Sequence, residues 1–309
     1  MNQQPPAATH EERQYLSLVD HVINNGDYKL DRTKVGTRSI FGNMMRFSLK
    51  DNTMPLFTTK KVYWRGVVEE LLFFLRGDTN ALHLSERGVH IWDAHSSATF
   101  LSSVDLGHRK EGDIGPMYGF QWRHFGAQYV DMDTDYTGKG IDQFADVLNR
   151  LKKNPTDRRI ILSAWNPVDL PNMALAPCHV MAQFYATLDH VTGVYNLSCM
   201  MTQRSADLGL GVPFNVASYA LLTHLIAHSV GMKAHELIYS TGDTHVYVNH
   251  IQPLKEQLAR TPRPFPKVDL SGWLVTEDPL SSFDLGLSAN DIKLVGYDPH
   301  PPIKMEIAV

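Results

Sequence analysis

The spacing of apolar and polar residues along the chain predicts an alternation of helices and strands. Apolar residues recur at helical spacing in three segments that end in glycine, asparagine or proline: 11–26, 64–80 and 141–155. Patterns typical of strands occupy four segments: 33–51, with a glycine-containing bend between two strands, 158–165, 179–188 and 193–205. No repeat or long linker interrupts this order, so we expect one domain over residues 13–309 after a short disordered lead-in over residues 1–12.

Composition narrows the class of protein. The chain has 309 residues and is 43% apolar, which is ample for a large core, and its net charge of -4 gives no general attraction to nucleic acid or membrane. An anionic ligand would therefore have to be bound by locally gathered arginines. Two cysteines cannot form a disulfide framework, and the 15 histidines show no zinc-finger spacing. Two cysteines fit a reducing compartment, and we find neither a signal peptide nor a membrane-spanning run. We therefore expect a cytoplasmic protein without a membrane partner, with nuclear or organellar traffic as an open alternative.

One carboxylate stands out in the predicted helix 64–80. Glu70 falls at the edge of the apolar face, beside Val67, Phe73 and Phe74, where partial desolvation would raise its pKa. An ordinary glutamate at the boundary of a helix face fits the same pattern, and the pattern alone favours that interpretation. The following segment 112–129 is rich in glycine and aromatic residues, which suits either loops close to a ligand or core packing with turns.

Cys178 precedes two predicted strands that are joined by the turn residues 189–193. If this hairpin turns near Val191, Cys178 lies opposite Arg204, whose positive charge would favour the reactive thiolate. Cys199 lies inside the second strand and is expected to be a small core residue. His179 points to the opposite face from Cys178, so it is poorly placed as a proton acceptor and more suited to ordering its surroundings. The same geometry disfavours a cysteine hydrolase.

Asn215 follows a glycine-containing loop at the start of a long apolar helix. It could cap that helix. Its amide could equally bind the edge of a uracil ring, where a carbonyl lies beside an N–H, because an amide both donates and accepts hydrogen bonds. Spacing alone does not decide between these two roles.

Several segments resemble the thymidylate synthase family, in order, from about Asp31 to Val309. They are "GPMYGFQWRHFGA", "RRIILSAWNP", "LAPCH", "QRSADLGLGVPFNVASYALL", "GDTHVYVNH" and "YDPHPPIKMEIAV". The resemblance implies a single α/β domain of the α+β type, with a large mixed sheet that forms the interface of an obligate homodimer. It implies deoxyuridine monophosphate as substrate and 5,10-methylenetetrahydrofolate as donor of carbon and hydride, with no metal and no nicotinamide. Binding to its own mRNA is a further family property.

The resemblance also assigns roles to individual residues. Cys178 matches the nucleophile that adds to carbon 6 of the pyrimidine, and Glu70 and Tyr118 match a proton-handling network at carbonyl 4, which displaces the boundary interpretation of Glu70. The implied catalytic residues are Cys178, Glu70, Tyr118, Asn215, Arg204 and His179. The implied nucleotide-binding residues are Arg32, Gln203, Arg204, Ser205, Asp207, Asn215, His245, Tyr247 and, from the other subunit, Arg158 and Arg159. The implied folate-binding residues are Trp92, His95, Asp207, Ala308 and Val309.

Two positions depart from the family pattern, and two alternatives stay open. His95 stands where many members carry asparagine, and Phe73 where tryptophan is common. A hydroxymethylase would use the same cysteine but end in water addition; Asn215 argues against the cytosine version, and Trp92 and the retained C-terminal tail disfavour the uracil version. The second alternative is a non-catalytic homodimer that binds nucleotide or RNA, against which the balanced charge argues.

Overall fold

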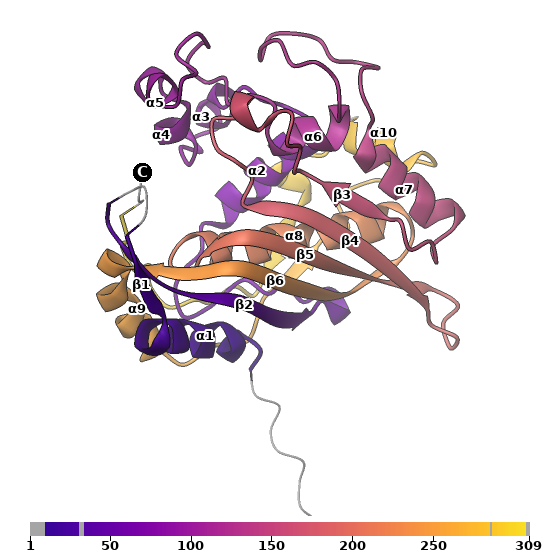
Figure 1. The fold of residues 1–309 in the computed structure, drawn as a ribbon. Coiled ribbons are helices and arrows are strands. Elements are labelled where there is room, and N and C mark those ends of the chain that lie inside the picture. The colour runs from indigo at the N-terminus through magenta and orange to yellow at the C-terminus, as the bar shows by residue number, and fades with distance from the viewer. Residues whose placement is uncertain (1–9, 31–33, 285, 307–309) are drawn as a thin grey trace, which may run out of the picture.

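A six-stranded mixed sheet organises the chain. The computed structural model describes residues 10–30, 34–284 and 286–306. The strands lie in the order β1-β2-β6-β5-β4-β3 (Figure 1). They span β1 Asp27–Lys29, β2 Thr37–Ser48, β3 Ile161–Ser163, β4 His179–Leu188, β5 Tyr195–Asp207 and β6 Lys233–Tyr247. Among the strands of the described residues, only β5 and β6 run parallel to each other. The long helix α8 connects them, because parallel neighbours need a crossover.

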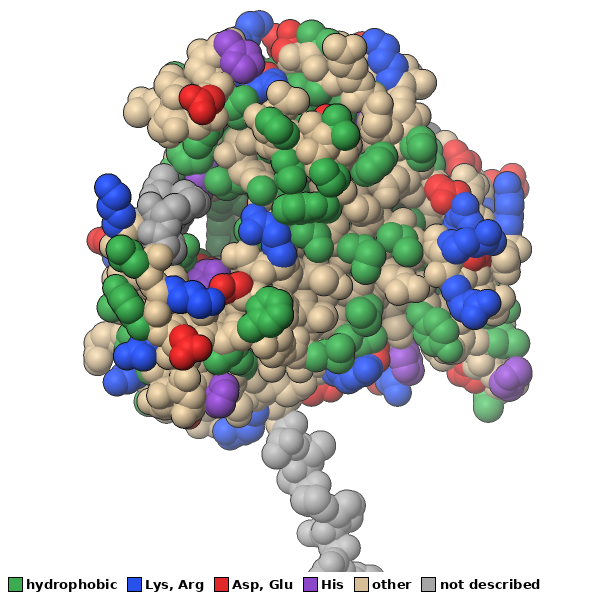
Figure 2. Space-filling view, viewed as in Figure 1, with side chains coloured by type: hydrophobic (Ala, Val, Ile, Leu, Met, Phe, Trp, Pro, Cys, Tyr) green, Lys and Arg blue, Asp and Glu red, His purple; other side chains and the backbone are tan. Residues whose placement is uncertain are grey.

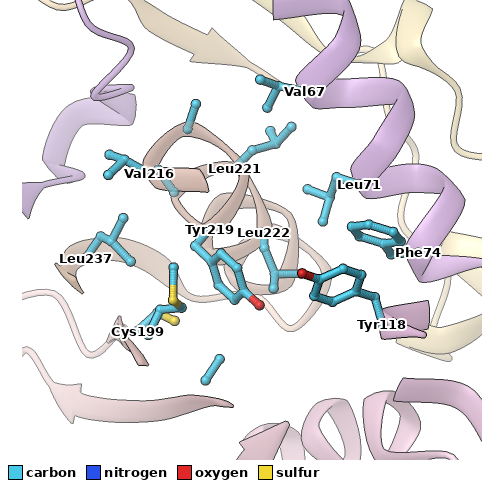
Figure 3. Close-up of a cluster of buried hydrophobic side chains, with 14 of the residues drawn as sticks. Val67, Leu71, Phe74, Tyr118, Cys199, Val216, Tyr219, Leu221, Leu222 and Leu237 are labelled. Atoms are coloured by element: carbon cyan, nitrogen blue, oxygen red, sulfur yellow. The ribbon is translucent and has the colours of Figure 1, made fainter. Parts of the chain in front are cut away.

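Helix α8, Gly211–Ser229, lies behind β5 and β6 in the view of Figure 1. Its sequence is apolar on every side, as expected for a helix that is buried all round. Helix α2, Trp64–Leu75, packs against α8, and Figure 3 shows side chains of both helices and of the strands meeting in one cluster. Cys199 belongs to this cluster with no exposed surface, and burial raises the pKa of its thiol to about 12. The prediction of a core cysteine is confirmed.

The remaining elements surround this centre. The other helices are α1 Glu12–Asn25, α3 Leu82–Glu86, α4 Asp93–Ser96, α5 Ala98–Ser103, α6 Tyr118–His124, α7 Gln143–Lys153, α9 Ile251–Leu258 and α10 Pro279–Asp284. Strands β7 Lys267–Asp269 and β8 Lys293–Val295 form a separate two-stranded antiparallel sheet. The 3-10 turns are η1 Lys50–Asn52, η2 Leu170–Asn172, η3 Val248–His250 and η4 Ala289–Asp291. Within the described residues, no helix combines the length and apolar character needed to cross a membrane.

The predicted helices are confirmed, with differences elsewhere. Glu12, at the boundary of the predicted lead-in, already lies in α1 with its buried carboxylate bonded to Thr58 and Thr59; residues 1–9 are outside the described range. Segment 33–51 forms one strand, β2, rather than the two predicted strands with a bend between them. Gly42 has a positive φ of 86°, but the strand continues past it. Segment 112–129 contains helix α6, whose Trp122 is buried, so the core-packing interpretation holds there.

The register of the β4–β5 hairpin has a bulge that matters for the site. Along most of the hairpin the pairing differs by one residue from the predicted register, with Gln183 opposite Met200. A shift between His179 and Met181 absorbs this residue, and His179 pairs with Gln203. Arg204 then donates its backbone N–H to the carbonyl of Cys178 at 2.8 Å. The predicted juxtaposition of Cys178 with Arg204 is confirmed.

The sheet has one covered face and one open face. Residues on the open face alternate with those that pack against α8. Tyr185 and Met44 are 64% and 50% exposed, and Met200 and Ile238 are half-buried beside them. Figure 2 shows hydrophobic side chains scattered over the side of the molecule on which the strands lie. The same face also carries the polar side chains of Gln183, Thr187 and Glu236. Large apolar side chains exposed among polar ones in this way are typical of an association surface.

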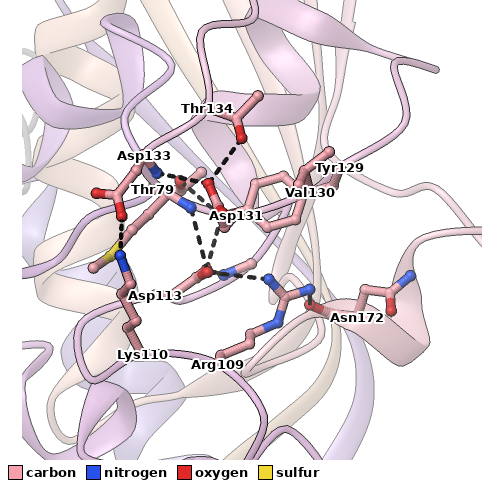
Figure 4. A network of polar contacts seen from close by, with 12 residues as sticks. Thr79, Arg109, Lys110, Asp113, Tyr129, Val130, Asp131, Asp133, Thr134 and Asn172 are labelled. Atoms are coloured by element: carbon pink, nitrogen blue, oxygen red, sulfur yellow. Dashed lines mark hydrogen bonds and ion pairs between the residues drawn. The ribbon is translucent and has the colours of Figure 1, made fainter.

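A polar network supports the loops that follow α5. Asp113, 1% exposed at its side chain, accepts a hydrogen bond from Arg109 at 3.2 Å and another from Tyr129 at 2.7 Å (Figure 4). The Arg109 guanidinium lies 4.7 Å from the centre of the Tyr129 ring and also donates to the carbonyl of Asn172. The network therefore joins the segment after α5 to the loop before Cys178.

Candidate active site

Cys178 lies immediately before β4, at the end of the sheet where β5 and β6 terminate. Cys178 is partly exposed, whereas Cys199 is buried, and the two cysteines are not joined in a disulfide. The backbone N–H of Cys178 donates to the hydroxyl of Tyr118 at 2.9 Å. Together with the bond from Arg204, this fixes both backbone polar groups of Cys178 and so orients its side chain.

Arg204 supports the segment that leads into Cys178. Its Nε donates to the carbonyl of Pro177 and its Nη2 to that of Ala176, both at 2.8 Å. The guanidinium also lies 5.6 Å from the centre of the Trp165 ring. The charge is therefore held beside the cysteine by three contacts, as a planar guanidinium permits.

Glu70 faces the interior from α2. It is 7% exposed, and its Oε1 accepts a hydrogen bond from the indole N–H of Trp92 at 2.8 Å. Burial raises the pKa of Glu70 to about 7, although the Trp92 bond opposes the rise. The predicted elevation of this pKa is confirmed. A carboxyl group with such a pKa can both release and accept a proton near neutral pH.

Tyr118 lies between Trp92, which binds Glu70, and the cysteine. Its ring stacks on His179 with centroids 4.0 Å apart and lies 6.3 Å from the Trp92 ring. Burial raises the pKa of Tyr118 well above its ordinary value, so the hydroxyl stays protonated. Tyr118 begins α6 with a φ of 24°, an unfavourable backbone conformation for a bulky residue that places its side chain between α2 and the cysteine loop.

His179 is a neutral structural neighbour of this group. It is 6% exposed, and its Nδ1 lies 2.8 Å from the hydroxyl of Tyr219 in α8. Burial lowers the pKa of His179 to about 3, so the ring is uncharged at neutral pH. These contacts agree with the expectation that His179 orders its surroundings. Sequence reasoning missed Tyr219, which lies four residues after Asn215 and so on the same side of α8.

Asn215 is held by a buried glutamine. It is the fifth residue of α8, which excludes the alternative that it is the N-cap. Its Oδ1 accepts a hydrogen bond from Nε2 of Gln203 at 3.2 Å, and Gln203 also bonds to the carbonyl of Ser205 and to the hydroxyl of Tyr239. Gln203 is 1% exposed, so its amide is fixed and in turn orients that of Asn215.

A second group of polar residues, centred on Asp207 and His245, lies at the ends of β5 and β6. Asp207 pairs with His245 across the strands and accepts the backbone N–H of Gly209 at 2.8 Å. Burial would raise the pKa of Asp207, but the nearby imidazoles of His250, 3.9 Å away, and His245 hold it below its ordinary value. His245 lies 3.2 Å from Asp243, which pairs with Ser205, and its ring meets that of Tyr247 edge-on at 5.3 Å.

The aromatic side of the site continues into α4. His95 lies one turn after Trp92, and the two rings meet edge-on with centroids 6.4 Å apart. His95 also packs edge-on against Phe100 at 5.0 Å. Trp92 thus contacts Glu70 and His95 and forms a wall between α2 and α4.

Some predicted residues are not part of this group. Arg158 and Arg159 precede β3; Arg159 is 79% exposed at its side chain and pairs with Asp157, and no contact between described residues joins either arginine to Cys178. Residues outside the described range are Arg32, Ala308 and Val309. Within the described residues, no three His, Cys, Asp or Glu side chains are arranged to hold a metal ion.

Comparisons with known proteins agree with this geometry. The sequence model of the family described as Thymidylate synthase matches residues 13–309. The chain is 54% identical to a thymidylate synthase of Agaricus bisporus, over 97% of this chain and 100% of that protein. It is 53% identical to the human thymidylate synthase, over 98% and 93% of the two chains. It is also 55% identical to a probable thymidylate synthase of Schizosaccharomyces pombe, over 97% of this chain but only 48% of that longer protein. The chain belongs to the thymidylate synthase family.

Proposed function

We propose that this protein is a thymidylate synthase, which converts deoxyuridine monophosphate to thymidine monophosphate and 5,10-methylenetetrahydrofolate to dihydrofolate. The observation that carries the proposal is the partly exposed Cys178, held between Tyr118 and Arg204, with the protonatable Glu70 reaching the same group through Trp92. The family match over residues 13–309 and the names of the relatives support it.

The nucleotide would bind at the common end of β4, β5 and β6. Arg204 and Ser205, with Arg32, bind the phosphate; His245 and Tyr247 bind the deoxyribose. Asn215, oriented by Gln203, donates to and accepts from the uracil edge. The thiolate of Cys178 then adds to carbon 6, and the electron pair of the double bond moves onto carbonyl 4, which makes carbon 5 a nucleophile.

Carbon transfer and reduction follow on the covalent intermediate. Carbon 5 attacks the methylene group of the folate and loses its proton, and tetrahydrofolate leaves with the electron pair. Hydride from tetrahydrofolate reduces the exocyclic methylene, and Cys178 departs as thiolate while dihydrofolate is formed. Glu70 and Tyr118 exchange protons around carbonyl 4, for which the pKa of Glu70, about 7, is suited.

The folate would lie against the aromatic wall. Trp92 and His95 border its ring system, Asp207 binds the pterin, and Ala308 and Val309 cover it. Trp92 holds Glu70 by a hydrogen bond, so it both orients the carboxyl group and excludes water from the methylene intermediate. Water exclusion is what separates reduction by hydride from hydroxymethylation.

The protein would act as a homodimer joined through the open sheet face. The exposed Tyr185 and Met44 and the half-buried Met200 and Ile238 on that face support this association. Among the described residues, no contact joins Arg158 or Arg159 to the site of their own subunit. In a dimer, their guanidinium groups would instead bind the nucleotide phosphate in the site of the second subunit.

A product assay tests the proposal. Purified protein is incubated with deoxyuridine monophosphate and methylenetetrahydrofolate; dihydrofolate is followed by absorbance and the nucleotide is identified by mass. We expect thymidine monophosphate and dihydrofolate in equal amounts. Hydroxymethyl-deoxyuridine monophosphate with tetrahydrofolate would instead identify a hydroxymethylase, and binding without product would identify a nucleotide-binding or RNA-binding homodimer.

A further inference from the structure

His250 connects the end of the chain to the interior. It is the last residue of η3, directly before α9, and is only 1% exposed. Its Nε2 lies 2.7 Å from the backbone carbonyl oxygen of Glu306. Because a carbonyl oxygen can only accept, Nε2 must carry the proton of this hydrogen bond. The contact spans 56 positions in the sequence and fixes the segment 304–306 against the folded body.

The other side of the His250 ring faces the Asp207 loop. Its Nδ1 lies 3.9 Å from Oδ1 of Asp207, beyond direct hydrogen-bond distance, and is buried without a hydrogen-bond partner among the described residues. Gly209 permits the close approach, since a Cβ there would lie 2.6 Å from this Nδ1 and 3.2 Å from the sulfur of Met305. A side chain at position 209 would therefore push His250 and the segment 304–306 apart from the loop.

Lys60 joins the same loop to the same segment from a different element. It is 6% exposed, and its Nζ donates to the carbonyl of Gly209 and lies 3.8 Å from the sulfur of Met305. Burial lowers the pKa of Lys60 to about 8, although the charge of Asp207 opposes the change. Lys60 thus contacts both the loop over residues 207–209 and the segment 304–306, while His250 is bonded to the segment and packs closely against the loop.

We infer that His250 is a positioning residue, which holds the segment 304–306 and the Asp207 loop in one arrangement through its bond to the Glu306 carbonyl. The inference rests on the proposed function, because Asp207 and the end of the chain are the proposed folate contacts. His250 touches neither the cysteine nor the residues proposed to bind the phosphate. Its ring meets that of Tyr247, a proposed deoxyribose contact, edge-on with centroids 5.6 Å apart. Loss of His250 should therefore weaken folate binding more than nucleotide binding.

Two amide substitutions separate this role from a general structural one. In His250→Gln the amide nitrogen can take the place of Nε2 and donate to Glu306, whereas the shorter His250→Asn cannot reach it. His224→Asn is the matched control, since His224 is also buried, at 4% exposure, and its Nε2 lies 2.9 Å from the carbonyl of Thr53. The measurements are KM for each substrate and hydrogen exchange of the peptide covering residues 300–306.

We expect His250→Asn to raise KM for methylenetetrahydrofolate about tenfold, as loss of one buried hydrogen bond implies, and to speed exchange in the peptide 300–306. KM for deoxyuridine monophosphate should change by less than about twofold, and His250→Gln should stay close to wild type. Equal effects of His250→Asn and His224→Asn, or unchanged exchange in His250→Asn, would overturn the inference. Failure of the proposed function would give a different result from failure of this inference. The wild-type protein would then form no thymidine monophosphate, while His250→Asn would still exchange faster than wild type in the peptide 300–306.

Discussion

Replacing Glu70 by glutamine keeps the shape of the side chain and the acceptor for Trp92 but removes the carboxyl group. In the folded protein burial raises the pKa of Glu70 to about 7, compared with an ordinary value of 4.5. At 1.36 kcal/mol for each pKa unit, this difference corresponds to about 3 kcal/mol of the free energy of unfolding. The side chain is only 7% exposed, so solvent screening reduces this magnitude little.

The sign of the pH effect follows from which state binds the proton more tightly. Below about pH 4.5 the carboxyl group is protonated in both states, and the stabilising contribution is fully present. As the pH rises from about 4.5 to about 7, the unfolded chain releases its proton first, so the free energy of unfolding of the wild type falls. Glu70→Gln lacks this proton and should not show this part of the loss.

Urea unfolding of both proteins between about pH 5 and 8.5, at equal protein concentration, measures the difference. We expect Glu70→Gln to gain about 2 to 3 kcal/mol relative to wild type across this range, while losing most of its turnover. Trp92→Phe provides a second test: it removes the N–H that favours the charged carboxylate, so the pKa of Glu70 should rise further and the loss of stability should extend to higher pH. Parallel pH curves for wild type and Glu70→Gln would refute the assignment of a raised pKa to burial of this group.

Four further predictions concern the nucleophile, base recognition, the assembly and the fold. Cys178→Ala should abolish turnover but retain nucleotide binding by calorimetry, since no proposed binding contact uses the thiol; residual turnover would remove the nucleophile. Asn215→Asp should shift preference toward the cytosine nucleotide in competition assays, and strict preference for uracil would leave Asn215 a structural role. Cys178→Ala and Arg158→Glu subunits, inactive alone, should recover about a quarter of wild-type activity when mixed at random, because half of the dimers hold one intact site; no recovery would argue against shared sites. Arg109→Gln should cost about 3 kcal/mol in urea unfolding by stranding the buried Asp113, and a loss below about 1 kcal/mol would show that water replaces the pair.

Local pattern predicted the features that depend on neighbouring residues in the sequence. Helix phase placed Glu70 at the buried edge of α2, where a raised pKa was one of two interpretations, and the resemblance to the family was needed to prefer it over an ordinary boundary glutamate. Turn residues and alternation predicted the β4–β5 hairpin, including the pairing of Cys178 with Arg204. That pairing was obtained although the register was one residue off, because the bulge after His179 compensated for the difference. No feature of a single strand reveals such a bulge.

Contacts between distant segments could not be predicted from the sequence. The partner of His179 is Tyr219, 40 positions away, and that of His250 is the carbonyl of Glu306, 56 positions away. Lys60 reaches Gly209 across 149 positions. In each of these pairs, a buried polar atom meets its hydrogen-bond partner only after distant segments have packed together. The residues near either partner in the sequence therefore do not predict the contact.

The proposed reaction depends on a covalent bond between Cys178 and carbon 6 of the pyrimidine. A fluorine at carbon 5 cannot leave as a proton, so 5-fluoro-deoxyuridine monophosphate with methylenetetrahydrofolate should stall the reaction after carbon transfer. Digestion of the stalled complex and mass spectrometry of its peptides locate the attachment. We expect one adduct, carrying nucleotide and folate together, on the peptide that contains Cys178. An adduct on the peptide of Cys199, or product formation from the natural nucleotide without any trapped adduct, would contradict it.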